Sequence, residues 1–222
     1  MFVRDYMTPN PIAISPDAVF PEAMNLLRQN KIRRLPVLDN GELVGIVVEK
    51  DLLSYSPSPA TSLSVYEMYY LLERLRVRQM MSHPVITVGG DCPLEEAARI
   101  MVERKVGSLP VMQGDRLVGI ITETDIFRTM VEVLGGQELG TRITLQIAER
   151  VGELAKVVTR IAEAGGNILA ITTSRVLAHS EREVMIKAVG AGPEKLSGML
   201  PAGEGKVVDI RSSARYQPRL FG

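Results

Sequence analysis

The chain has 222 residues, room for two or three small domains, and its 26 lysine and arginine residues balance its 26 aspartate and glutamate residues. A net charge of zero provides no overall field for a nucleic acid, so we expect no nucleic-acid binding. The one cysteine excludes an internal disulfide, and no apolar run is long enough for a membrane span or a signal peptide, which favours a cytoplasmic protein without a membrane contact.

An early segment of the chain occurs twice. Residues Val3–Leu53 recur as Val77–Phe127 at a constant offset of 74 positions and without a gap. The clearest match joins Leu43–Asp51 to Leu117–Asp125. A repeat at a fixed offset indicates the architecture of a chain more strongly than any single residue does. We therefore predict an α/β (α+β) fold in which two copies of one small unit pack as a pseudo-twofold pair with two related clefts.

Each copy has the pattern strand, helix, strand, strand, helix. In the first copy, the pattern predicts an extended piece at 12–14, a helix at 18–30 capped by Asp17, strands at 35–38 and 43–48, and a helix from Asp51. In the second copy, it predicts helices at 95–103, after Asp91, and at about 123–134, with a turn at 113–115. So small a sheet cannot bury one face alone, and we expect the copies to pack sheet against sheet.

A loop and a helix separate the two copies. Serine and proline dominate residues 54–61, which we predict to be a loop. Ser64 and Glu67 then have the spacing of a capping box at the start of a helix. Apolar residues at three- and four-residue steps predict that this helix packs along the repeat pair or at a subunit interface.

After residue 137 the repeat stops and a different pattern begins. The predicted elements are a strand at 142–147, a helix at 153–164, strands at 168–176 and 183–189, a helix at 193–200 and a strand at 206–210. This order, strand, helix, strand, strand, helix, strand, is typical of a ferredoxin-like fold.

Three features recur in both copies in the same order. They are a Met-(Thr/Ser) opening at Met7 and Met81, an (Arg/Ser)-Leu-Pro-Val strand, and a Gly-Ile-hydrophobic ending that closes on Asp51 or Asp125. With these features, roughly the first 135 residues resemble the CBS domain, and the tandem resembles a CBS pair, or Bateman module. The resemblance implies that an adenosine-containing ligand, such as AMP, ADP, ATP or S-adenosylmethionine, binds in the cleft between the copies.

The Thr122-x-x-Asp125 pair suits such a ligand. A carboxylate accepts hydrogen bonds from both ribose hydroxyls, while a hydroxyl and the free amides of a helix N-terminus receive a phosphate. The same pair also fits a helix capping box, and the motif alone leaves both interpretations open. The first copy retains Asp51 but has Val48 in place of the threonine, so we expect the site at Asp125 to be the better formed one.

By resemblance, two arginines beside the cleft strand are candidates for the phosphate. The alternative is an ordinary solvated strand edge, because the second copy has Gly107 and Ser108 at these positions. The predicted nucleotide-binding residues are Thr122, Asp125, Asp51, Ile120, Arg33, Arg34, Thr87 and Val88. The adenine nucleotide would be a regulatory ligand and not a catalytic cofactor.

Gly152-Glu153-Leu154 follow the first predicted strand of this segment, and Gly166-Asn167-Ile168 follow its first predicted helix. With these motifs, residues 140–212 resemble an ACT domain. In that family, the loop after the first strand lets the backbone approach an amino-acid ligand at the interface between two ACT domains. The matching positions here make Glu149, Val151, Gly152 and Asn167 the ligand or interface residues. Gly152 suits a close approach. Glu149 is longer than the usual acid and Val151 replaces the usual proline, so an ACT domain that only dimerises is the alternative.

We do not expect an enzyme. The two histidines, His83 and His179, fall in different predicted domains, and neither has a nucleophile spacing to Cys92. The sequence contains no phosphate-binding loop, zinc-protease helix or serine-nucleophile elbow. We predict no catalytic residue and no metal site.

A CBS pair followed by an ACT domain resembles the bacterial acetoin utilisation protein family, which implies a part in acetoin or butanediol breakdown. The predicted domains are a first CBS repeat at 1–60, a linker helix at 61–76, a second repeat at 77–136, an ACT domain at 140–212 and a tail at 213–222. We predict a homodimeric regulatory protein that senses an adenosyl ligand and acts on an unknown protein. The alternatives are a dimerising scaffold with vestigial sites and an amino-acid sensor that works through the ACT interface.

Overall fold

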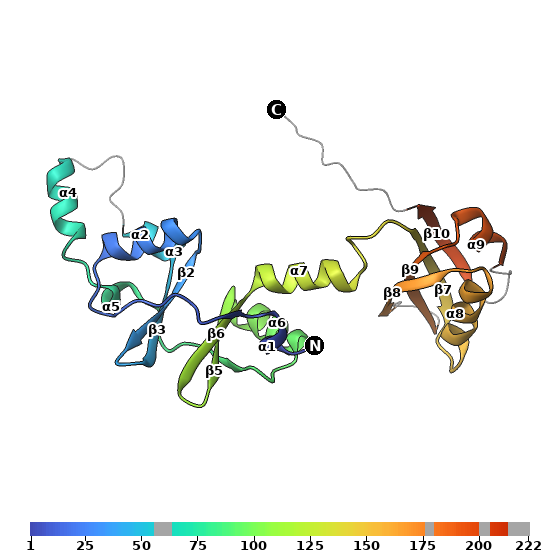
Figure 1. The fold of residues 1–222 in the computed structure, drawn as a ribbon, viewed down its shortest axis with the longest axis horizontal. Coiled ribbons are helices and arrows are strands. Elements are labelled where there is room, and N and C mark those ends of the chain that lie inside the picture. Colours follow the sequence, from blue (N-terminus) through green and yellow to red (C-terminus); the bar gives the residue numbers. More distant parts are fainter. Residues whose placement is uncertain (56–63, 176–179, 200–204, 213–222) are drawn as a thin grey trace. The chain divides into compact units, whose positions relative to one another are not determined.

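The computed structural model describes residues 1–55, 64–175, 180–199 and 205–212. The chain forms two compact units, Met1–Phe127 and Arg128–Gly222, and each buries its own apolar residues (Figure 1). The predicted tail at 213–222, His179 and most of the predicted loop at 54–61 lie outside the described residues.

The first unit contains both copies of the repeat. The first copy provides α2 (Phe20–Asn30), β2 (Arg34–Asp39), β3 (Glu42–Val48) and α3 (Glu49–Ser54). The second copy provides β4 (Val88–Gly89), α6 (Leu94–Arg104), β5 (Ser108–Gln113), β6 (Arg116–Thr122) and the start of α7 (Glu123–Val133). The predicted order of helices and hairpin strands is confirmed in both copies.

Asp17 does not cap α2, so that prediction is wrong. The N-cap is Val19, which makes no side-chain hydrogen bond, and a proline in the first turn has no amide hydrogen that needs a partner. The Asp17 carboxylate instead accepts a hydrogen bond from the Arg78 guanidinium, which belongs to the opening of the second copy.

The two copies exchange their opening strands. β1 (Thr8–Pro9) comes from the first copy and pairs with β6 of the second, so that Thr8 lies opposite Ile120. At the equivalent point of the other copy, Ser82 bridges to Ile46 of β3. Each hairpin therefore receives a further extended segment from its neighbour, which the sequence pattern alone did not predict.

The short helices before these segments follow the same exchange. In α1 (Val3–Tyr6), the Val3 amide donates to the Cys92 carbonyl of the second copy (2.9 Å). In α5 (Val77–Met80), the Val77 amide donates to the Ala18 carbonyl of the first copy (2.9 Å). Both valine side chains are fully buried in the core of the opposite copy. Neither copy therefore has a complete core by itself.

Two glycines, in strands β3 and β6, leave room for the methionine side chains of the exchanged openings. A methyl group at Gly119 would overlap the Met7 side chain, and a methyl group at Gly45 would overlap Met81. These contacts are equivalent at the repeat offset, so the same packing occurs twice. Strands β3 and β6 contact each other, which confirms the predicted packing of one sheet against the other.

The helix between the copies is α4 (Val65–Leu72). The Ser64 amide donates to Glu67 Oε2 (2.8 Å) and the Glu67 amide donates to Ser64 Oγ (3.3 Å), which confirms the predicted capping box. Leu72 and Leu75 pack against the first core, while Tyr66 and Tyr70 are exposed. The helix is therefore anchored to the repeat pair at its C-terminal end.

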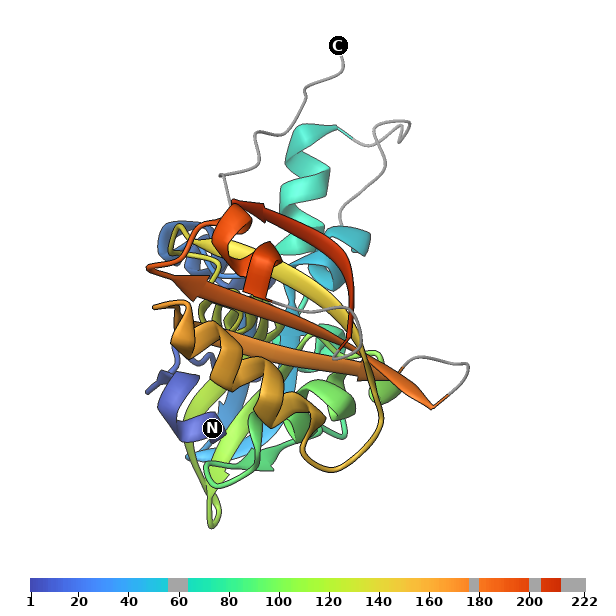
Figure 2. The same cartoon turned by 90° about the vertical axis from the view of Figure 1, so that its right-hand side faces the viewer.

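The second unit is one antiparallel sheet with two helices. Its elements are β7 (Thr141–Ala148), α8 (Glu153–Glu163), β8 (Asn167–Arg175), β9 (Glu181–Val189), α9 (Pro193–Met199) and β10 (Lys206–Ser212). The strand order is β10-β7-β9-β8, and both helices lie on the same face of the sheet (Figures 1 and 2). The predicted order of elements, that of a ferredoxin-like unit, is confirmed.

The two faces of this sheet carry different residues. The helix-covered face contributes Ile143, Leu145 and Ile186 to the core, together with side chains from α8 and α9. On strand β9, Lys187 is only 7% exposed, and its ammonium donates to the carbonyl oxygens of Gly135 (2.5 Å) and Glu138. This lysine therefore ties the segment before β7 to the sheet.

Candidate functional site

Thr122 and Asp125 lie where β6 leads into α7, and Asp51 lies where β3 leads into α3. In the first copy, the Glu49 amide at the start of α3 donates to the Arg33 carbonyl (2.9 Å). In the second copy, the Glu123 amide at the start of α7 donates to the Gly107 carbonyl (3.1 Å). Each helix start is thus fixed to the residues that precede β2 or β5.

Thr122 and Asp125 hold each other at the start of α7. The Thr122 hydroxyl and amide both donate to Asp125 Oδ2 (2.7 and 3.0 Å), and the Asp125 amide donates to Thr122 Oγ1 (3.4 Å). This is the reciprocal pattern of a capping box, so the capping interpretation of the motif is confirmed. The two side chains proposed for ribose and phosphate are therefore already oriented by each other.

The first copy lacks this arrangement. Val48 is the N-cap of α3 and makes no side-chain hydrogen bond. Asp51 lies exposed in the first turn of that helix, where a negative charge is favoured by the helix dipole. The two helix starts are therefore chemically unequal, in the direction expected from the sequence.

Arg34 crosses from the first copy to the second. Its Nη2 lies 3.9 Å from Glu123 Oε2, and its guanidinium covers Gly107 so closely that a methyl group there would overlap it. Burial lowers the pKa of Arg34, the Glu123 carboxylate opposes this shift, and Arg33 adds to it. Arg33 itself is exposed. A half-buried guanidinium thus lies next to the α7 start, with a carboxylate as its partner.

The remaining predicted residues do not lie at the helix starts: Ile120 is on β6 two residues before Thr122, Val88 is on β4, and Thr87 precedes β4. Ile120 is 8% exposed and stands opposite Thr8 of the exchanged strand. Val88 is also 8% exposed, and its side chain belongs to the core of the second copy. The Val88 side chain is therefore occupied by packing, and a binding role for this residue would depend on its backbone.

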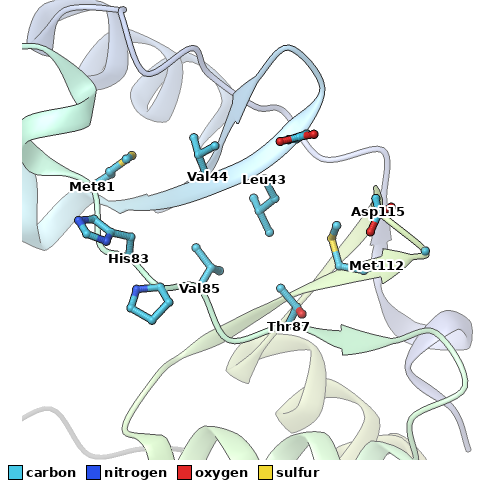
Figure 3. Close-up of a pocket in the computed structure, with 11 residues that line it drawn as sticks. Leu43, Val44, Met81, His83, Val85, Thr87, Met112 and Asp115 are labelled. Carbon is cyan, nitrogen blue, oxygen red and sulfur yellow. The ribbon is translucent and has the colours of Figure 1, made fainter.

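Thr87 lines a separate cavity of about 850 Å³ at the opposite, hairpin ends of the strands. Figure 3 shows Leu43 and Val44 on one side of this space, with Met112 and Asp115 on the other. The full lining is Glu42, Leu43, Val44, Met81, His83, Pro84, Val85, Thr87, Met112, Gly114 and Asp115. Sequence reasoning missed this cavity because its residues come from a strand start, a turn and a connecting segment that have no common motif.

The second unit has a smaller cavity of about 300 Å³ beside the end of β7. Glu149 lines it and forms an ion pair with Arg182 of β9, which also donates to Thr173 Oγ1 (3.1 Å). The hydrogen bond to Glu149 raises the pKa of Arg182. Sequence reasoning named Glu149 but missed Arg182 and Thr173, which reach the site only through strand pairing.

The other predicted residues of this unit surround the loop before α8. Gly152 has φ +89°, a conformation that favours glycine, and a methyl group there would meet no atom within 4 Å. Val151 is fully exposed, and Asn167 is exposed at the start of β8. Of the four predicted residues, Glu149 is thus the one that lines the cavity.

Within the part of the chain that the structure describes, no three histidine, cysteine or carboxylate side chains are grouped so that they could hold a metal ion. None of the helices among these residues has both the length and the apolar character that crossing a membrane requires.

Comparison with known proteins identifies the repeated segment. The family model described as CBS domain matches residues 3–58 and 77–132. A CBS domain-containing protein of Dictyostelium discoideum is 32% identical over 136 residues, which are 60% of this chain and 94% of that protein.

Solved structures give the same result. The Arabidopsis thaliana protein CBSX2, solved in complex with AMP, is 30% identical with a TM-score of 0.51 and covers 60% of this chain and 97% of its own. A Vibrio cholerae protein described as an acetoin utilization protein (AcuB) is 31% identical with a TM-score of 0.51 over 62% of this chain and 95% of its own. The CBS pair of protein MJ0100, solved with 5′-methylthioadenosine and S-adenosyl-L-methionine, is 26% identical with a TM-score of 0.50 over 62% of this chain and 98% of its own.

Proposed function

Because this chain belongs to the CBS domain family, we propose that it is a regulatory protein that binds an adenosyl ligand, such as AMP, ADP, ATP or S-adenosylmethionine, between its two repeats. One observation carries the proposal: Thr122 and Asp125 hold each other at the start of α7, and Arg34 lies beside Glu123 in the same turn. The complexes of CBSX2 with AMP and of MJ0100 with S-adenosylmethionine support the ligand class.

The three groups have complementary roles in this proposal. The Asp125 carboxylate accepts hydrogen bonds from the ribose hydroxyls. The Thr122 hydroxyl, the first amides of α7 and the Arg34 guanidinium receive the phosphate or another anionic group. Apolar contact with the base falls to Ile120 and its neighbours. The site at Asp51, without a threonine, is the weaker of the two.

Ligand binding shifts a conformational equilibrium only if the ligand has unequal affinity for the two states. Arg34 provides that inequality, because a phosphate competes with Glu123 for its guanidinium. The contact between the two copies therefore differs between the free and the bound protein, and this difference is the regulatory signal.

The proposal for the second unit is an ACT domain at 140–212. The Glu149–Arg182 pair beside a cavity favours amino-acid binding as a second candidate function. A free amino acid carries one carboxylate and one ammonium, which match Arg182 and Glu149 in turn. The remaining alternative is an ACT domain that only dimerises.

A homodimer is part of the proposal. Leu53 and Phe127 occupy equivalent positions in the two repeats and are 50% and 65% exposed. Such paired apolar side chains suit a twofold interface. We further propose a cytoplasmic location, the domain boundaries given above, an unknown regulated protein, and a role in acetoin or butanediol breakdown, which the likeness to AcuB supports.

Calorimetric titration of AMP, ATP and S-adenosylmethionine tests the nucleotide site. We expect binding to the wild-type protein that Asp125→Ala abolishes, while Asp51→Ala, at the equivalent position of the other repeat, has the smaller effect. Glu22→Gln, an exposed change in α2, is the control for nonspecific charge effects. If none of the three ligands gives heat at two temperatures, the nucleotide proposal is wrong.

A further inference from the structure

The 850 Å³ cavity in the first unit has two kinds of lining (Figure 3). The apolar side chains are Leu43, Val44, Met81, Val85 and Met112, and the polar ones are Glu42, His83, Thr87 and Asp115. The repeat provides an internal comparison, because every one of these positions has a counterpart in the other copy.

Most apolar positions are apolar in both copies. At the repeat offset, Leu43 and Val44 correspond to Leu117 and Val118, Met81 corresponds to Met7, and Met112 corresponds to Leu38. Met81 and Met7 also make equivalent contacts with their glycines. These side chains therefore serve the packing that the two copies share.

At each of the four polar positions, the other copy has a different kind of residue. The counterparts of Glu42, His83, Thr87 and Asp115 are Arg116, Pro9, Ala13 and Gly41. At these four counterpart positions, the repeat thus adopts the same fold without a carboxylate, an imidazole or a hydroxyl. Folding of the repeat does not require these four side chains, which leaves them available to a ligand.

The charge of the lining indicates the ligand. Glu42 and Asp115 are both exposed, and their carboxylates form no ion pair or hydrogen bond with any residue that the structure describes. No lysine or arginine lines the cavity. Two carboxylates without a cationic partner therefore border an apolar floor of leucine, valine and methionine, which favours a cation with an apolar body.

We infer that this cavity is a binding site for a linear aliphatic amine, with its ammonium groups at Glu42 and Asp115 and its methylene chain on Leu43 and Met112. An ammonium donates three hydrogen bonds to carboxylates, and the methylene chain gains from leaving water. The inference is independent of the nucleotide proposal, because Thr122, Asp125 and Arg34 do not line this cavity.

Methionine methyl NMR of the full chain tests the site. The probes are 1,6-diaminohexane and 1,6-hexanediol, which have the same chain and differ in charge. We expect the diamine to shift the Met81 and Met112 methyl signals, and the diol to shift them much less. Met7, the counterpart of Met81, and the buried Met24 and Met101 are internal controls that should not move.

Two charge-removing variants complete the test. Glu42→Gln and Asp115→Asn should each weaken the diamine about fivefold, as expected for one exposed ion pair, and the double variant should reduce its affinity to that of the diol. Glu22→Gln, outside the cavity, should leave the affinity unchanged. Three results would overturn the inference: no shift with millimolar diamine, equal shifts with the diol, or the same affinity in the double variant when its methyl spectrum shows a folded protein.

Discussion

Arg34 of the first repeat and Glu123 of the second form an ion pair between the copies, with 3.9 Å between Nη2 and Oε2. The pair has no counterpart on the other side, because Ser108 replaces the arginine opposite Glu49. Gly107 makes room for the guanidinium, and its own counterpart is Arg33. One glycine and one arginine thus make a nearly symmetric pair of repeats electrostatically unequal.

If the proposed nucleotide site is correct, Glu123 competes with the ligand phosphate for Arg34. Glu123→Gln should then raise the affinity for ATP about fivefold at low salt, which corresponds to about 1 kcal/mol. The gain should shrink in 0.5 M NaCl, because salt screens partly exposed charges. Calorimetry at two salt concentrations measures both effects. Glu49→Gln is the matched control, and an unchanged or lower affinity in Glu123→Gln would contradict this role.

The close approach of Met81 to Gly45 makes the first sheet sensitive to one methyl group. Gly45→Ala should lower the free energy of unfolding by about 1–3 kcal/mol, because the added atom overlaps the Sδ and Cγ atoms of Met81. Urea denaturation gives this value. In a Met81→Ala background the same change should cost much less, and equal costs in the two backgrounds would show that this contact is not the cause.

The exchanged openings predict which copy loses stability when a buried valine of an opening is truncated. Val3→Ala removes two buried methyl groups from the second-repeat core, and Val77→Ala does the same in the first. We expect each to cost about 1–3 kcal/mol. Hydrogen exchange should rise at the Val3 and Arg4 amides and at the Leu94 amide of the second repeat in Val3→Ala. In Val77→Ala it should rise at the Val77 and Arg78 amides and at the Phe20 amide of the first repeat, because these amides donate the hydrogen bonds between each opening and the opposite copy. Unchanged exchange at Leu94 in Val3→Ala and at Phe20 in Val77→Ala would exclude this arrangement.

The sequence predicted most of the helices and strands, but not which of them pack or pair with one another. Apolar periodicity placed the longer helices and the hairpin strands of the repeats, because those patterns are local, whereas the four-residue helices α1 and α5 were not predicted. The exchange of openings was not predictable, since Val3 and Val77 look the same whichever core they join. Similarly, the Thr122–Asp125 cap follows from spacing, whereas the contact of Arg34 with Glu123 joins positions far apart in the chain and depends on how the copies pack.

Cys92 offers a test at alkaline pH. Burial, followed by the nearby carboxylates of Glu96, Asp91 and Glu95, raises the pKa of this thiol in the folded protein. Alkylation by iodoacetamide at pH 8.5 should therefore be slower in the folded chain than in urea. A thiol whose pKa is higher when folded stabilises the protein only below its unfolded pKa, about 8.5, and that contribution is lost as the pH rises further. Unfolding free energy should thus fall above pH 8.5 more in the wild type than in Cys92→Ser, and parallel curves would contradict the shift.

Removal of the Lys187 ammonium should loosen one segment of the second unit. Lys187→Met keeps most of the aliphatic volume but removes the ammonium that binds the Gly135 and Glu138 carbonyls. Two carbonyls then lose a charged donor, at an expected cost of about 1–3 kcal/mol. Because Met fills the same space, the loss should appear as faster hydrogen exchange and proteinase K cleavage at 134–140, with little change in the core strands β7 and β9. Lys195→Met, an exposed change in α9, should leave both readouts unchanged. If the 134–140 segment stays as protected in Lys187→Met as in the wild type, contacts other than this lysine hold it to the sheet.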